Sequence, residues 1–123
     1  MATFRRFEDI QAWQKARVIT QNVYRITANG SFAKDYGLRD QLRRASVSIM
    51  ANIAEGFARR SDRDFANFLN ISRSSTAEVQ SHLYVALDQK YMSQADFDEL
   101  YLAVEKASKM IFALARHLIA RAQ

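Results

Sequence analysis

The side chains best suited to bind another molecule in this 123-residue chain are its arginines. They account for 13 of the 18 basic residues, and the formal net charge is +5. A guanidinium group presents its donors in a planar fork that fits phosphate and carboxylate oxygens. Residues 1–73 hold 13 basic and 7 acidic side chains, whereas residues 74–123 hold 5 and 6. The positive charge is therefore concentrated in the first part of the chain.

This distribution favours an anionic partner, and nucleic acid is the first class that an arginine-rich surface suggests. The arginines that we assign to such a surface are Arg39, Arg43, Arg59, Arg60, Arg63 and Arg73. The alternative is a solvated surface on which neighbouring carboxylates, such as Asp62 and Asp64, neutralise the arginines. The charge count by itself leaves both interpretations open.

A second set of polar residues lies on one stripe of a helix that we predict over 36–58. Spaced three and four residues apart, its members are Gln41, Arg44, Ser48, Asn52 and Glu55. We predict a largely buried polar network with four members, Arg44, Asn52, Glu55 and, from the next helix, Glu78. Charges are tolerated inside a protein when they are paired and hydrogen-bonded. The network would fix the register of the two helices or line a ligand pocket, within one chain or between chains.

Few residues suggest catalysis or metal binding. The chain has no cysteine, and its two histidines, His82 and His117, fall on different predicted helices. Neither belongs to the Glu-x-x-His motif that di-iron bundles use twice. The serines between 72 and 81 have no His–Asp pair placed to activate them. We therefore expect no catalytic residue, no metal site, no cofactor and no enzymatic activity.

Four amphipathic helices are predicted to carry these side chains. Apolar residues recur three and four positions apart, as on one face of a helix, over about 9–28, 36–58, 62–90 and 94–121. The residues that we expect to be buried are Trp13, Leu42, Ile49, Ile53, Phe65, Leu69, Val79, Leu83, Val104, Ile111 and Leu114.

Short segments separate these helices, which favours antiparallel neighbours. Ser61 and Ser93 are each followed three residues later by an aspartate, a variant of the capping box that begins helices. Gly30 is able to adopt the left-handed conformation that ends them. With no proline and three glycines, the chain lacks the residues of turn-rich β folds. We predict one all-α domain over residues 1–123, an antiparallel up-down-up-down four-helix bundle.

The predicted helix over 36–58 carries more apolar surface than one bundle face requires. Val47 and Met50 lie outside its main apolar stripe, so we expect them at an oligomer interface. The longest uncharged run, residues 45–54, has ten residues, whereas a membrane span needs about 20. We therefore expect a cytoplasmic protein without a membrane segment.

Several motifs, taken in order, resemble one known family. The segments are 7–17 (Phe-Glu-Asp-Ile-Gln-Ala-Trp-Gln-Lys-Ala-Arg), 36–45 (Tyr-Gly-Leu-Arg-Asp-Gln-Leu-Arg-Arg-Ala) and 52–56 (Asn-Ile-Ala-Glu-Gly). Over nearly its whole length the chain resembles the four-helix-bundle family of proteins encoded in intervening sequences of bacterial 23S ribosomal RNA genes. It is also similar to the accessory variability proteins of diversity-generating retroelements. It departs from the family pattern at Ala33 and Met50, where the family has proline, and at Ser74-Ser75, where it tends to have Gly-Ser.

The resemblance implies a ring-shaped homo-oligomer, a homopentamer, without enzymatic activity. From the retroelement relatives it implies nucleic acid and a reverse transcriptase as partners. Two functions stay open at this point. One is an oligomeric module that binds structured RNA or DNA; the other is a structural ring that docks a partner protein and has no nucleic-acid role.

Overall fold

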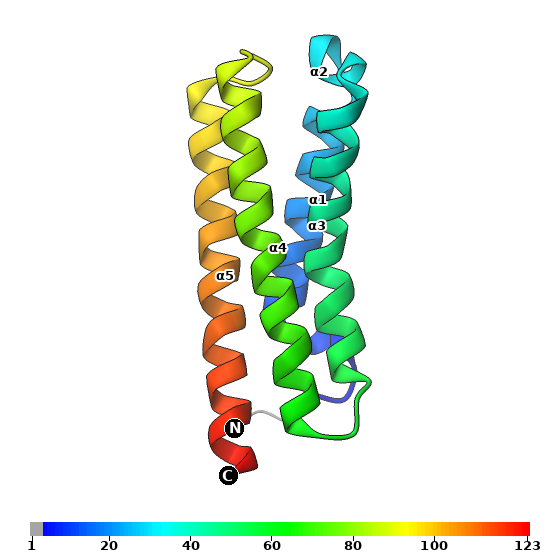
Figure 1. The fold of residues 1–123 in the computed structure, drawn as a ribbon, viewed down its shortest axis with the longest axis vertical. Helices are drawn as coiled ribbons and strands as arrows, with labels where there is room; N and C mark the ends of the chain where they lie inside the picture. The colour runs from blue at the N-terminus through cyan, green and yellow to red at the C-terminus, as the bar shows by residue number, and fades with distance from the viewer. Residues whose placement is uncertain (1–3) are drawn as a thin grey trace.

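The computed structural model describes residues 4–123 as a bundle of four long helices (Figure 1). The helical elements are η1 (Phe7–Asp9), α1 (Gln11–Ile26), α2 (Gly30–Lys34), α3 (Tyr36–Phe57), α4 (Asp62–Asp88) and α5 (Gln94–Ala122). The long helices α1, α3, α4 and α5 run alternately up and down, and no strand occurs among residues 4–123. The predicted all-α bundle is confirmed.

The long helices pack mainly as sequential neighbours, α3 against α4 and α4 against α5, while α1 closes the bundle against α3 and α5. In Figure 1, α2 and the α4–α5 connection lie at the top, which we call the apical end. The α3–α4 connection and the end of α5 lie at the bottom, which we call the basal end. The α1–α5 seam is the least extensive, because α1 has 16 residues and α5 has 29.

The helix boundaries follow local signals that the sequence carries. The Ser61 and Ser93 hydroxyls each accept a hydrogen bond of 3.1 Å from the backbone N–H three residues later, which confirms both predicted caps. Gly30 has a φ of +61°, the left-handed conformation expected of it. The segment 29–35 was predicted as a connection, yet α2 forms there, with Phe32 buried.

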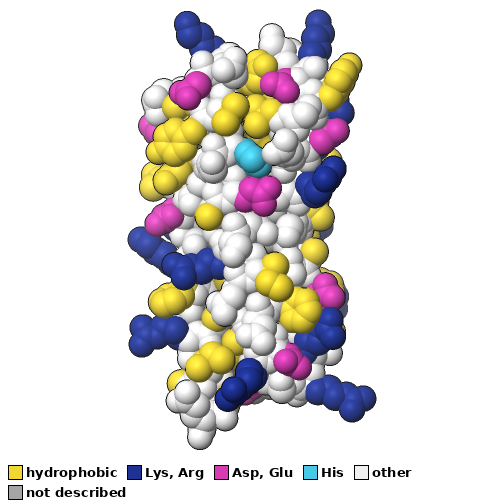
Figure 2. Space-filling model, viewed as in Figure 1, with side chains coloured by type: hydrophobic (Ala, Val, Ile, Leu, Met, Phe, Trp, Pro, Cys, Tyr) yellow, Lys and Arg dark blue, Asp and Glu magenta, His cyan; other side chains and the backbone are white. Residues whose placement is uncertain are grey.

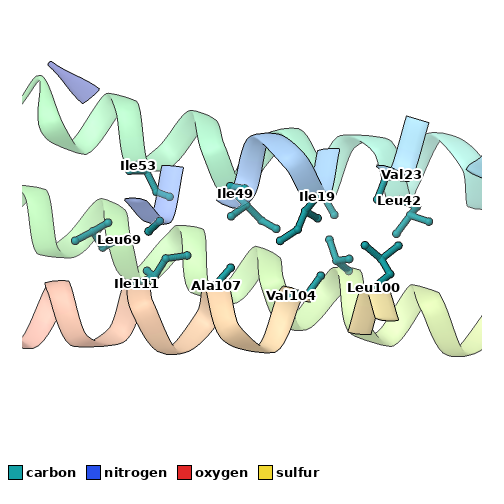
Figure 3. Close-up of a cluster of buried hydrophobic side chains, with 14 of the residues drawn as sticks. Ile19, Val23, Leu42, Ile49, Ile53, Leu69, Leu100, Val104, Ala107 and Ile111 are labelled. Carbon is teal, nitrogen blue, oxygen red and sulfur yellow. The ribbon is translucent and has the colours of Figure 1, made fainter. Parts of the chain in front are cut away.

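Apolar side chains from all four long helices meet along the bundle axis (Figure 3). Nine of the eleven predicted core residues are buried, and Trp13 and Leu114 are half-buried. Trp13 lies at the rim of the bundle, edge-on to Phe7 at 5.0 Å between ring centroids. Leu114 borders a surface hollow beside Ala12, whose methyl group is too small to cover it. Both predictions of full burial were wrong, and for Leu114 the reason is that the start of α1 leaves its seam with α5 partly open.

A row of small side chains lets α3 and α4 approach closely. The Ser72 hydroxyl donates to the Ile49 carbonyl across the interface at 2.7 Å. The Ser48 and Ser75 hydroxyls lie 2.9 Å apart and are hydrogen-bonded. Among residues 4–123, no buried side-chain nitrogen or oxygen lacks a hydrogen-bond partner. The polar atoms between the helices are thus satisfied locally, as burial requires.

Asp35 connects two parts of the apical end. Its Oδ1 accepts a hydrogen bond from the Leu38 N–H at 3.2 Å and caps α3. Its Oδ2 accepts one from the Tyr91 hydroxyl at 2.9 Å, and the Tyr91 ring stacks on Phe32. The bond to Asp35, followed by burial, raises the pKa of Tyr91 above its ordinary value of 10.

Replacing Tyr91 with phenylalanine is expected to lower the melting temperature at neutral pH. The phenol donates to Asp35 only while it is protonated, and its pKa is raised in the folded state. Its contribution is therefore present at neutral pH and is lost as the pH rises through that raised pKa. Thermal melts of Tyr91→Phe and wild type should converge in strongly alkaline buffer. Tyr36→Phe, at an exposed ring, is the control; a Tyr91→Phe difference that is the same at every pH would contradict the assignment.

Candidate nucleic-acid interface

The net positive charge of the chain lies on one half of the α4–α5 face. We define the basal α4–α5 region as residues 55–75 and 106–123. Both segments lie in the lower half of Figure 1. This region holds eight basic and three acidic side chains, a net +5, whereas the remaining residues hold ten of each. Figure 2 shows dark-blue side chains along both edges of the lower half of this face. The excess positive charge of the chain therefore falls in this region, and the remaining residues are neutral overall.

Three of the predicted arginines, Arg59, Arg60 and Arg63, come together around the α3–α4 connection. Arg59 pairs with Glu55 at 3.1 Å, and its guanidinium lies over the Phe68 ring at 4.5 Å. Arg60 and Arg63 are exposed and form no ion pair with other residues of the 4–123 range. Their donors are available to a partner.

The alternative of local neutralisation applies to two carboxylates here, Glu55, which pairs with Arg59, and Asp62. Asp62 is held by the fork of Arg121, with nitrogen–oxygen distances of 2.7 and 2.8 Å. This bond lowers the pKa of the Asp62 carboxyl below its ordinary value. Asp62 is therefore engaged by α5 and is not paired with the arginines beside it in sequence.

The structure separates Arg39 and Arg43 from the other predicted arginines. They lie near the apical start of α3, about 30 Å (Arg39) and about 24 Å (Arg43) from Arg59 at 1.5 Å per residue. Arg39 covers the Tyr36 ring and pairs with Asp40 at 2.9 Å.

Arg43 covers the Tyr24 ring at 4.6 Å and donates to the Thr27 hydroxyl at 2.8 Å. Within one chain, Arg39 and Arg43 therefore lie apart from the other four predicted arginines, and nucleic-acid binding by the six stays a prediction. A helix of 22 residues carries its two ends to opposite poles of the bundle.

Arg73 lies in a groove between α4 and α5. Two adjoining hollows of ≈ 530 and ≈ 340 Å³ share Asn70 as a lining residue. We call them together the α4–α5 groove, and its central lining residues are Asn70, Arg73, Ser74, Ser108, Lys109, Phe112 and Arg116. Three of these side chains are cations.

The sequence prediction did not include Lys109 and Arg116. They fall in residues 74–123, whose net charge is −1, so the average conceals them. The feature of the sequence that could have identified them is their spacing of seven residues. This spacing places two cations on one face of a helix, two turns apart. That face becomes part of the groove when α5 packs on α4.

The predicted polar network is not formed within one chain. Arg44, Glu55 and Glu78 are exposed. Glu55 pairs with Arg59, and Glu78 lies 3.4 Å from His82. Each carboxylate is thus next to a basic side chain four residues later in the sequence. Water still reaches both partners of each pair.

Asn52 alone of the four turns toward the α3–α4 interface. It is half-buried and donates to the Ser48 carbonyl at 2.9 Å. Serine hydroxyls form the polar contacts between α3 and α4 that were predicted for the charged residues. Removing a hydroxyl from water costs less free energy than removing a charged group. A network between chains stays a prediction.

The residues predicted at an oligomer interface lie on α3. Val47 is exposed, and Met50 is half-buried against the core.

Among residues 4–123, no group of three or more His, Asp or Glu side chains is arranged to hold a metal ion. Within the same range, every helix is too short or too polar to cross a membrane.

Comparison with known proteins agrees with the fold. The profile described as 23S rRNA-intervening sequence protein matches residues 8–113. A solved structure, of a protein with unknown function from the S23 ribosomal protein family of Bacteroides thetaiotaomicron VPI-5482, is similar with a TM-score of 0.77 and 21% identity. The alignment covers 85% of this chain and 97% of that one. No curated protein matches in sequence. Because the profile spans most of the chain, including the Asn-Ile-Ala-Glu-Gly run at 52–56, the chain belongs to the 23S rRNA-intervening sequence protein family.

Proposed function

We propose that this protein is a non-enzymatic, oligomeric bundle that binds nucleic acid through the basal α4–α5 region. The observation that carries the proposal is the segregation of charge, with eight basic against three acidic side chains there and a neutral remainder. Arg60 and Arg63 support it further, because both are exposed. Arginine forks suit phosphate oxygens.

Contacts of this kind are made to the phosphate backbone and carry little base preference. A single chain offers few of them, but five copies of a +5 chain in a ring would repeat the same basic region around the axis. If four to six phosphates are neutralised, log affinity should fall with log salt at a slope of roughly −4 to −5 for duplex DNA.

The experiment is a fluorescence anisotropy titration of labelled RNA hairpins, duplex DNA and single strands at increasing salt. The proposal expects binding at low salt, a linear salt dependence and similar affinities for unrelated sequences. Failure to bind any of these probes at about 50 mM salt would overturn it, because electrostatic binding is strongest there.

The proposed assembly is a homopentameric ring with Val47 and Met50 at the contact. Val47 supports it, since 39% of this apolar side chain is exposed in the single chain. A ring contact is heterologous, one patch against a different patch. We expect Val47→Glu to shift the sedimentation-equilibrium mass toward the 14.1 kDa monomer. Gln41→Glu, which adds the same charge to a polar exposed position of α3, should leave the mass unchanged. A wild-type monomer at micromolar concentration would contradict the ring.

One observation favours the second function, a ring that docks a partner protein. A hollow of ≈ 580 Å³ lies between the start of α1 and α5, with mostly apolar lining from Phe4, Ile10, Met110 and Leu114. Surface hollows of this composition are typical of protein contacts. If the nucleic-acid titration fails, this second function becomes the preferred one. The partner class that the resemblance suggests is a reverse transcriptase.

A further inference from the structure

The α4–α5 groove contains a layered arrangement of one aromatic ring and two guanidinium groups. The Arg73 guanidinium carbon lies 4.4 Å from the centre of the Phe112 ring, and that of Arg116 lies 5.9 Å from the same ring. Phe112 is 40% exposed, so the arrangement lies at the surface. A guanidinium that covers a ring with one face offers its other face as a flat, charged platform.

Arg73 has two contacts within the chain. Its Nε donates to the Ser108 hydroxyl at 3.4 Å, and its guanidinium lies over the Phe112 ring. Fixing an arginine side chain in advance removes entropy that binding would otherwise cost. The basal region therefore contains, in Arg73, a cation that already has contacts within the chain, in addition to the exposed Arg60 and Arg63.

The remaining lining of the groove is small and polar. Asn70 and Ser74 from α4 and Ser108 from α5 supply amide and hydroxyl groups. These groups hydrogen-bond to base edges and sugar hydroxyls. Lys109 and Arg116 lie two turns apart on α5 and can contact phosphates on either side of the platform.

An acidic group marks the apical limit of the groove. Glu105 accepts a hydrogen bond from Gln80 at 2.9 Å and lines the upper hollow. Its carboxylate repels phosphate, whereas the basal side carries the three cations. A polyanion in the groove would therefore extend toward the basal arginines.

This combination fits an unpaired strand better than a duplex. The bases of a duplex are stacked on one another and present only edges, so a flat platform finds no exposed base face. Proteins that hold single strands combine cations along the backbone with aromatic or arginine planes under the bases. A groove between two packed helices is also narrow, with helix axes about 8–10 Å apart.

We propose that the α4–α5 groove binds a single-stranded segment of nucleic acid, with a base stacked on Arg73 where Phe112 supports it. The proposal rests on the proposed function and deepens it. In this arrangement the basal arginines supply affinity for any polyanion, and the groove supplies the preference for unpaired bases.

The test compares charge-conserving variants on two probes, a labelled oligouridine and a duplex of equal length. Phe112→Leu and Arg73→Lys each remove a planar surface and keep the net charge. Each should weaken binding of the oligouridine about tenfold, as loss of one stacked base does. Duplex affinity should stay within about twofold, and the salt slope for both probes should be unchanged because no charge is lost.

The chain provides a matched control at the apical end. Tyr36 carries Arg39 at 4.8 Å, the same kind of pair outside the groove. Tyr36→Leu, and Arg17→Lys at an arginine that lies 5.9 Å from the Trp13 ring, should therefore leave both affinities unchanged. Circular dichroism melts of all variants verify folding, and Arg73→Lys keeps the test valid if Phe112→Leu lowers stability.

A second readout reports stacking directly. The fluorescence of 2-aminopurine in the strand should be quenched by wild type and less by Phe112→Leu at saturating protein. Equal losses on both probes, or no loss on either, would overturn the groove proposal and leave the proposed function standing. Binding of polyglutamate as tight as that of an oligouridine of equal charge would also overturn it. If the wild type binds neither nucleic-acid probe, both proposals fail.

Discussion

Gly56→Ala is expected to destabilise the bundle by about 1 kcal/mol, the difference between about 2 kcal/mol for overpacking a close contact and about 1 kcal/mol gained in helix propensity. A Cβ at this position would lie 2.7 Å from the Phe68 Cβ and 3.2 Å from the Phe65 carbonyl oxygen. Both atoms move only with the α4 backbone, so α3 and α4 would have to separate. The gain in helix propensity from glycine to alanine, about 1 kcal/mol, offsets only part of this cost.

The matched control lies in the same helix. Gly37 is exposed, and a Cβ there meets nothing closer than the Asp35 Oδ1 at 4.0 Å. Gly37→Ala should therefore stabilise the protein, by up to about 1 kcal/mol. Urea unfolding of both variants measures the two effects, which are expected to have opposite signs. If Gly56→Ala is as stable as Gly37→Ala, the close approach of α3 and α4 at this point is wrong.

Reversing the charge of Arg60 and Arg63 together should weaken nucleic-acid binding about 100-fold, if each arginine contacts one phosphate. The double variant Arg60→Glu/Arg63→Glu should also make the slope of log affinity against log salt shallower by about 2. Both residues are exposed, so the bundle should keep its stability. Anisotropy titrations over a range of salt concentrations give affinity and slope together.

The control variant is Lys34→Glu/Lys90→Glu at the apical end, where both side chains are exposed. Each double variant lowers the formal net charge from +5 to +1. If binding follows the net charge alone, the two variants will lose affinity equally, and the basal α4–α5 region is not the contact surface. We expect the affinity of the apical variant for nucleic acid to fall by less than about fivefold. The apical charges lie farther from the basal α4–α5 region than the Debye screening length.

The structure gives the 52–56 run of the family a physical explanation. Asn52 bonds to Ser48 beside α4, Ile53 is in the core, and Glu55 pairs with Arg59. Gly56 is where α4 passes so close that a side chain has no room. In this chain the run therefore positions α3 against α4.

The sequence by itself determined the helices, their caps and most of the core. These features depend on neighbours within one or two turns, so spacing and capping residues such as Ser61 and Ser93 are sufficient to predict them. It failed where local signals were ambiguous. The segment at 29–35 contains the short helix α2, Trp13 packs against Phe7 and stays half-buried, and Leu114 lies at a seam that α1 does not fully cover.

Only the tertiary structure decided which polar side chains meet. Arg39 and Arg59 both belong to the basic first part of the sequence, residues 1–73, yet they lie near opposite ends of α3 and so of the bundle. Arg73 and Phe112 are far apart in sequence and lie in contact, because α4 and α5 are antiparallel and pack side by side. Helix periodicity gives the direction in which a side chain points, whereas the length, direction and packing of the helices decide what it meets there.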